Sequence, residues 1–189
     1  MIEVRQNIGR SGSSPLHSQI YRHAKGEAVA VDLPGGKTLF ALLRSDSDVE
    51  WAAQVMHLLA PQIQGETSQD SFDNVLLIKG KVEVPRTFPR VAWIPTRSAY
   101  PMMVVFGDPT DPTSVTKVDP DDLAATFGEG VKLKRVTVEL TDDPVSTGIE
   151  KRLAWLSSYP EPSLRPGHDL NDFSLPATLR HGDFRRGQN

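Results

Sequence analysis

The sequence predicts an α+β fold, in which a predominantly antiparallel β-sheet carries two or three helices. Segments with the apolar content of strands outnumber segments with helical periodicity, and turns of hairpin length separate many of these strands. Strands and helices also do not alternate regularly, as they would in an α/β protein with a parallel sheet. These observations favour an antiparallel sheet that is supported by a few helices.

The clearest predicted hairpin joins residues 27–33 to residues 37–43. The sequence Pro-Gly-Gly at residues 34–36 suits the dihedral angles of a tight turn. Both arms are apolar at nearly every position, so we expect them at the centre of the sheet with both faces covered. A further edge strand is predicted at residues 2–5, where apolar and polar residues alternate, and a loop at residues 9–14.

Three segments have the features of helices. The first is predicted at residues 48–60, after the capping-box spacing Ser47-x-x-Glu50, with an apolar face of Val49, Ala52, Met56 and Leu59. A short second helix is predicted after the acidic residues 119–122, which suit a helix N-terminus. The third begins at the spacing Thr147-x-x-Glu150, and its apolar face contains Ile149, Leu153 and Leu156.

Further strands are predicted at residues 82–84, 91–94 and 102–106. Residues 75–78 fit two interpretations equally, a strand or the end of a helix that starts near Ser71. The longest strand is predicted at residues 131–140. Its apolar alternation changes phase in the middle, which indicates a β-bulge or a change in the face that is buried.

One domain is predicted, at residues 1–158. The chain has 189 residues, which is long enough for one hydrophobic core and short for two ordinary domains. Residues 159–189 are rich in proline and poor in periodic apolar positions. We therefore expect them to form a C-terminal tail that wraps around the surface or is partly disordered.

Composition excludes several classes of function. The net charge of -3, from 21 basic and 24 acidic residues, is too balanced to attract nucleic acid, which we do not expect as a partner. The chain contains no cysteine, so disulfides, thiolate nucleophiles and cysteine zinc sites are excluded. No stretch approaches the roughly 18 apolar residues of a membrane span, so a soluble domain is predicted.

No catalytic, metal or cofactor site is predicted. Acidic residues gather between Asp108 and Asp122, where calcium would find oxygen ligands, but the EF-hand spacing is absent and Asp-Pro pairs are common in turns. The five histidines are too dispersed for a standard zinc motif, and the serine elbow G-x-S-x-G does not occur. Turns and helix caps are therefore the favoured interpretation of the acidic residues.

The favoured contact surface contains Trp93, Arg97 and Tyr100, close in sequence to Arg90. Aromatic residues and arginine are enriched at the centres of protein interfaces. The alternative is that Trp93 belongs to the core and the arginines are solvated. No cofactor is expected at this surface, and its predicted partner is another protein.

Three segments, residues 26–33, 119–127 and 144–153, resemble an uncharacterised family of bacterial proteins, and the resemblance extends over most of the chain up to Leu156. In that family the strand that matches residues 2–5 usually follows another strand and a short apolar anchor. The resemblance thus implies a periplasmic, membrane-anchored location if the true start lies upstream. From its residues as written, the chain is expected in the cytoplasm. The family has no established activity, so no functional residue is carried over.

The sequence favours a non-catalytic interaction or structural domain of a bacterial envelope-associated protein. The alternative is a small, hydrolase-like enzyme whose site is assembled from distant loops, and a metal- or sugar-binding module is a third possibility. These hypotheses predict different surfaces. An enzyme places convergent titratable groups with shifted pKa values in a deep pocket, whereas an interaction domain presents a shallow apolar patch or a sheet edge.

Overall fold

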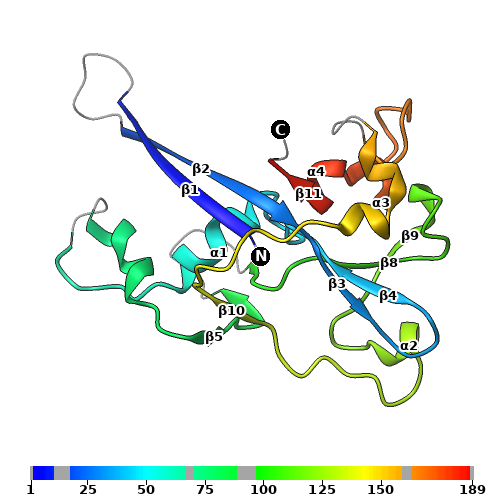
Figure 1. The fold of residues 1–189 in the computed structure, drawn as a ribbon, viewed down its shortest axis with the longest axis horizontal. Helices are drawn as coiled ribbons and strands as arrows, with labels where there is room; N and C mark the ends of the chain where they lie inside the picture. Colours follow the sequence, from blue (N-terminus) through cyan, green and yellow to red (C-terminus); the bar gives the residue numbers. More distant parts are fainter. Residues whose placement is uncertain (1, 11–17, 67–69, 89–96, 159–162, 188–189) are drawn as a thin grey trace.

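The computed structural model describes residues 2–10, 18–66, 70–88, 97–158 and 163–187. It confirms the α+β class, because the strands pair only in antiparallel fashion and four α-helices accompany them in these described ranges. Figure 1 shows a long hairpin that projects from a body in which the other elements gather. None of the helices in the described ranges has the length and hydrophobicity that crossing a bilayer requires.

The projecting hairpin belongs to a three-stranded sheet. It consists of β1 (Ile2–Arg10) and β2 (Ser18–Glu27), and the short strand β11 (Arg185–Arg186) pairs with the other side of β2. The predicted edge strand at residues 2–5 is thus confirmed, and it continues to Arg10, two residues into the predicted loop. Residues 11–14 of that loop lie outside the described residues.

The second sheet has the strand order β3-β4-β8-β9, and its strands are Val29–Asp32, Thr38–Ala41, Met103–Phe106 and Val115–Lys117. The predicted hairpin is confirmed, with Val29 opposite Ala41. Of the two hairpin strands, however, only β4 lies in the interior of the sheet. The prediction that both arms are covered is wrong for β3, which is an edge strand whose Val29 and Val31 are 55% and 42% exposed.

Two short ribbons complete the strands. β5 (Lys81–Glu83) pairs with β10 (Thr137–Glu139), and β6 (Thr87–Phe88) pairs with β7 (Arg97–Ser98). The predicted strand at residues 102–106 is confirmed as β8, whereas the one at residues 91–94 lies outside the described residues.

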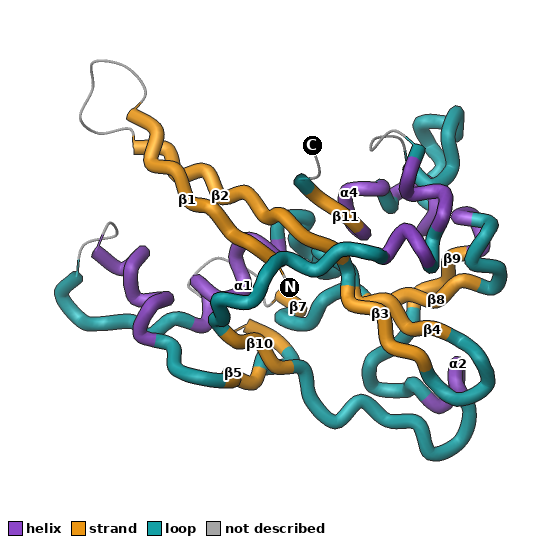
Figure 2. Tube along the Cα trace, viewed as in Figure 1, coloured by secondary structure: helices purple, strands orange, loops and turns teal. Residues whose placement is uncertain are grey.

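The long strand predicted at residues 131–140 is wrong for residues 131–136, which Figure 2 shows as loop before β10. The phase change has a clear structural cause. Val131 and Leu133 pack against the cluster that contains Leu39 of β4, whereas Val138 packs against the cluster around Trp51. The segment thus passes from one part of the core to another and changes its buried parity as it does so.

The longest α-helix, α1 (Trp51–Leu59), starts three residues later than predicted, because the expected capping box does not form. The Asp48 carboxylate instead accepts a hydrogen bond from the Glu50 N–H at 2.8 Å and closes a turn before the helix. Val49 therefore lies outside the helix and is 51% exposed, whereas Trp51 and Val55 are buried. Residues 75–78 follow the helical alternative, since a 3₁₀ helix covers Asp70–Leu77.

The second predicted helix is confirmed as α2 (Ala124–Phe127). The third is replaced by two 3₁₀ turns, Ile149–Lys151 and Ala154–Ser157, because Leu153 between them has non-helical dihedral angles of -128° and 78°. Its predicted apolar face is nevertheless buried in full. The Glu27 carboxylate fixes the first turn by accepting the Ile149 N–H at 2.8 Å.

Residues 163–187 form part of the same core and are not a surface tail. They contain two short helices, α3 (Leu175–Thr178) and α4 (His181–Phe184), and the side chains of Leu164, Leu179 and Phe184 are at most 1% exposed. Their lack of periodicity reflects one-turn helices, each of which contributes only one buried apolar residue, Ala177 in α3 and Phe184 in α4. In the described residues 163–187, the predicted tail is therefore part of the folded core.

The four-stranded sheet has apolar clusters on both faces. Phe40 and Val104 face one cluster, which the 3₁₀ turns and residues 164–184 cover, whereas Leu39 and Met103 face the cluster that contains Phe127 of α2. A third cluster lies around α1 and includes Ala24 of β2. Together these clusters position the loops that follow β4, β7 and β9 around one concave surface.

Candidate functional site

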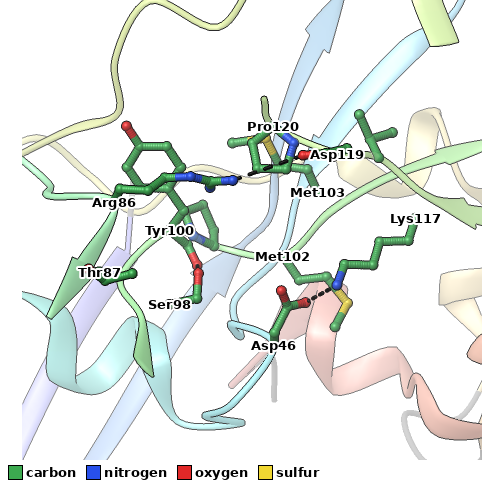
Figure 3. Close-up of a pocket in the computed structure, with 12 residues that line it drawn as sticks. Asp46, Arg86, Thr87, Ser98, Tyr100, Met102, Met103, Lys117, Asp119 and Pro120 are labelled. Atoms are coloured by element: carbon green, nitrogen blue, oxygen red, sulfur yellow. Dashed lines mark hydrogen bonds and ion pairs between the residues drawn. The ribbon is translucent and has the colours of Figure 1, made fainter. Parts of the chain in front are cut away.

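A cavity of about 490 Å³ opens between the ribbon β6–β7 and the strands β8 and β9. Figure 3 shows its side chains, which come from four separate parts of the chain. The cavity is large enough for a side chain or a short peptide segment rather than for a single ion. Its lining residues are Asp46, Arg86, Thr87, Ser98, Tyr100, Pro101, Met102, Met103, Lys117, Val118, Asp119 and Pro120.

Arg86 provides one cationic group at the rim. Its guanidinium lies 2.5 Å from the Asp121 carboxylate and 4.0 Å from that of Asp119. The guanidinium also lies over the Tyr100 ring, 4.9 Å from its centroid, which is the geometry of a cation–π interaction. Two acidic residues before α2 and one aromatic residue after β7 therefore orient this arginine. Figure 3 shows Arg86 with Asp119 and Tyr100.

Lys117 provides the second cationic group, from the last residue of β9. Its Nζ lies 2.8 Å from the Asp46 carboxylate, which belongs to the loop after β4. This pair lies apart from Arg86 in Figure 3, so cationic and anionic groups are present at two places on the rim. Both ion pairs are open to solvent, with side-chain exposures between 40% and 72%.

The floor of the cavity is apolar and buried. Met102, Met103 and Val118 are 8%, 4% and 0% exposed, and proline residues complete the lining beside them. Main-chain hydrogen bonds hold this floor in place, since the Met103 carbonyl accepts the Val118 N–H at 2.9 Å and the Arg44 carbonyl accepts the Met102 N–H at 2.8 Å. The floor therefore lies at the edge of the four-stranded sheet, where β8 begins at Met103 and β9 ends just before Val118.

Helix α1 fixes the opposite wall. The Trp51 indole Nε1 donates a hydrogen bond of 2.9 Å to the carbonyl of Ala99, which is fully buried. The Ala99 N–H in turn donates a hydrogen bond of 3.2 Å to the Arg86 carbonyl. A buried side chain far away in the sequence thus aligns the two segments that supply Arg86 and Tyr100.

The charged and polar groups of the lining are two carboxylates, two cations and three hydroxyl groups. The lining contains no histidine, and the Ser98 hydroxyl donates a hydrogen bond to the Tyr100 carbonyl at 3.5 Å. A serine nucleophile requires a base within hydrogen-bond reach, which a main-chain carbonyl does not provide. Cations, carboxylates and apolar contacts are the interactions that this cavity makes available.

The sequence-predicted contact residues have three different locations. Tyr100 lines the cavity, Arg97 pairs with Phe88 in the β6–β7 ribbon, and Trp93 lies outside the described residues. Sequence reasoning missed Arg86 and Lys117 as cavity residues beside Tyr100. The acidic partners of Arg86 were interpreted as part of a helix N-terminus, and no local spacing could connect residues so far apart in the sequence.

The acidic residues between Asp108 and Asp122 form turns and a helix cap, as favoured from the sequence. Asp108 Oδ1 accepts the backbone N–H and the hydroxyl of Thr110, both at 2.8 Å. The backbone hydrogen bond and then the hydroxyl lower the pKa of Asp108 below its usual range. Asp122 accepts the Ala125 N–H at 3.1 Å in α2. Within the described ranges, no three acidic or histidine residues are grouped so that they could hold a metal ion.

Comparisons with known proteins give no relative: no family model, no curated protein sequence and no solved structure matches this chain. The cavity therefore has to be interpreted from its own chemistry.

Proposed function

We propose that this chain is a non-catalytic interaction domain that binds an extended segment of another protein in the cavity beside Tyr100. The observation that carries this proposal is the combination of a buried apolar floor with two solvent-open ion pairs at the rim. Such a surface accommodates an apolar side chain and contacts charged groups on either side of it.

The energetics of the rim support binding. Exposed ion pairs contribute only about 0.2–1 kcal/mol each, so charged groups of a ligand can exchange with Asp46 or Asp121 at small cost. The floor residues are themselves at most 8% exposed, so the apolar surface that is buried on binding belongs mainly to the ligand and contributes about 25 cal/mol per Å². The predicted ligand therefore has an apolar anchor residue that is flanked by charged residues.

The proposal also includes association with the bacterial envelope, which rests on the resemblance of residues 26–33, 119–127 and 144–153 to an uncharacterised bacterial family. Fractionation of the host cell with an antibody against this chain tests that part. Recovery in the cytosolic fraction alone would contradict it.

Selection of peptides from a random display library, followed by titration of the enriched peptides, tests the binding function. The substitution Thr87→Trp adds a large side chain at an exposed position of the lining. Thr116→Trp is the matched control, because Thr116 is also exposed and lies on β9 outside the lining. We expect Thr87→Trp to weaken binding by about tenfold or more, which corresponds to about 1.4 kcal/mol, and Thr116→Trp to have little effect.

Two results would contradict the proposed binding site. The first is that no peptide is enriched above the background of the library. The second is that both tryptophan variants bind the enriched peptides with the affinity of the unmodified protein.

A further inference from the structure

The outer edge of β1 is a second surface, separate from the cavity. Among the described strands, β1 pairs with β2 and with no other, so one side of its main chain has no strand beside it. The strand has nine residues, a length of about 30 Å at 3.3 Å per residue. In Figure 1 its outer half extends with β2 beyond all other described elements, so another chain can approach it.

We propose that a second copy of this chain pairs with β1 in antiparallel orientation, which produces a two-fold symmetric dimer with a continuous six-stranded sheet. The strand order across the dimer is then β11-β2-β1 followed by β1-β2-β11 of the other copy. On the opposite side of each sheet, β11 pairs only with Gly26 and Glu27 of β2. The β1–β1 contact uses the same edge of both copies, so two copies satisfy each other and the contact itself closes at a dimer.

The sequence of β1 is complementary to itself in one register. A two-fold axis perpendicular to the sheet leaves corresponding faces on the same side, so residues of the same parity face each other. When Gln6 lies opposite Gln6 of the other copy, all nine residues pair and Val4 lies opposite Ile8. Val4 is 43% exposed in the single chain, so it has apolar surface to bury in this register.

Charges favour the same register. With Gln6 at the axis, Arg5 lies opposite Asn7 and Glu3 opposite Gly9, so no like charges face each other directly. Moving the axis by one residue to Arg5 places two arginines opposite one another, which is destabilising. The register that uses the whole strand is thus also free of this repulsion.

Sedimentation equilibrium of the full chain and of charge variants at Asn7 tests the dimer. In the proposed register Asn7→Glu places a carboxylate opposite Arg5 at two symmetric positions, whereas Asn7→Arg places two arginines opposite each other. Cross-strand pairs contribute about 0.2–1 kcal/mol each, so the dimer dissociation constant should fall about 2- to 30-fold for Asn7→Glu. It should rise by a similar factor for Asn7→Arg, and Arg5→Glu combined with Asn7→Arg should restore dimerisation.

The same two substitutions at the exposed Asn171, which lies outside all strands, control for net charge. Circular dichroism of each variant checks that the hairpin still forms. A chain that is monomeric at all accessible concentrations would overturn the proposal. So would Asn7 variants whose dissociation constants change only as much as those of the Asn171 variants.

Discussion

Two aspartates show how the same carboxyl group acquires opposite properties from its surroundings. Burial raises the pKa of Asp183 above its usual range, although the Arg180 N–H and the guanidinium groups of Arg44 and Arg186 act in the other direction. Asp32 is exposed and forms hydrogen bonds of 2.5 Å and 2.8 Å with Arg152. This partner, followed by Thr38, lowers the pKa of Asp32.

Replacement of each aspartate by asparagine should therefore change the pH dependence of stability in opposite directions. A raised folded-state pKa means that the free energy of unfolding decreases as pH rises from about 4 through that pKa. Asp183→Asn removes this decrease, so the stability of the variant relative to the unmodified protein should rise with pH. For Asp32→Asn the relative stability should fall with pH, because the favourable ionised form is lost.

Urea unfolding between pH 3 and pH 7 measures both differences. Parallel pH profiles of the two variants would show that these carboxyl groups do not have opposite shifts. Only the pH dependence is compared, so effects of asparagine that do not vary with pH do not enter the comparison.

At the level of elements, the proline-rich C-terminal segment differs most from its sequence-based expectation. It folds into single turns that deliver isolated apolar side chains to the core, and β11 then adds to the hairpin sheet. Two main-chain hydrogen bonds attach it further, since the Phe184 carbonyl accepts the Ala28 N–H at 2.8 Å and the Asp183 carbonyl accepts the Leu43 N–H at 2.9 Å.

Two phenylalanines of this segment provide a matched test of its structural role. Phe184 is 0% exposed and contacts the rings of Phe106 and Trp155, with ring centroids 5.8 Å and 5.5 Å apart, whereas Phe173 is 81% exposed. Phe184→Ala should lower the free energy of unfolding by about 3–5 kcal/mol, and Phe173→Ala by about 0.5 kcal/mol or less. Equal effects in urea denaturation would contradict the packing of this segment.

For the whole molecule, the three apolar clusters share elements and should unfold together. Two of them cover opposite faces of the four-stranded sheet, and Val136 packs against both the cluster of Phe127 and the cluster of Trp51. Because no cluster can separate without exposing part of another, we expect a single cooperative transition.

Variants with a single tryptophan make this expectation measurable. Trp51 belongs to the cluster around α1, and Trp155 packs against the cluster that contains Phe106. Because the chain has a third tryptophan, each variant also carries Trp93→Phe. In Trp51→Phe/Trp93→Phe and in Trp155→Phe/Trp93→Phe, urea transitions followed by fluorescence and by far-ultraviolet circular dichroism should coincide within each variant. Separate midpoints for the two signals would indicate independent units.

Only one residue of the candidate cavity could be identified from local sequence. Tyr100 was singled out from local composition, because aromatic residues and arginines gather near it. Its arginine partner proved to be Arg86, and Lys117 and Asp46 joined the rim only through the pairing of strands. Such residues have no characteristic spacing, so an isolated sequence provides no signal for them.

Alternation and turn chemistry, which depend on neighbouring residues, determined the α+β class, the hairpin at residues 27–43 and the short helix after Asp122. The buried face of residues 149–156 was also determined in this way, although its turns are not α-helical. Only tertiary structure decided that β3 is an edge, that residues 131–136 leave the ladder and that the C-terminal segment enters the core. These outcomes depend on which distant segments supply hydrogen bonds and apolar contacts, and that competition is not encoded in local periodicity.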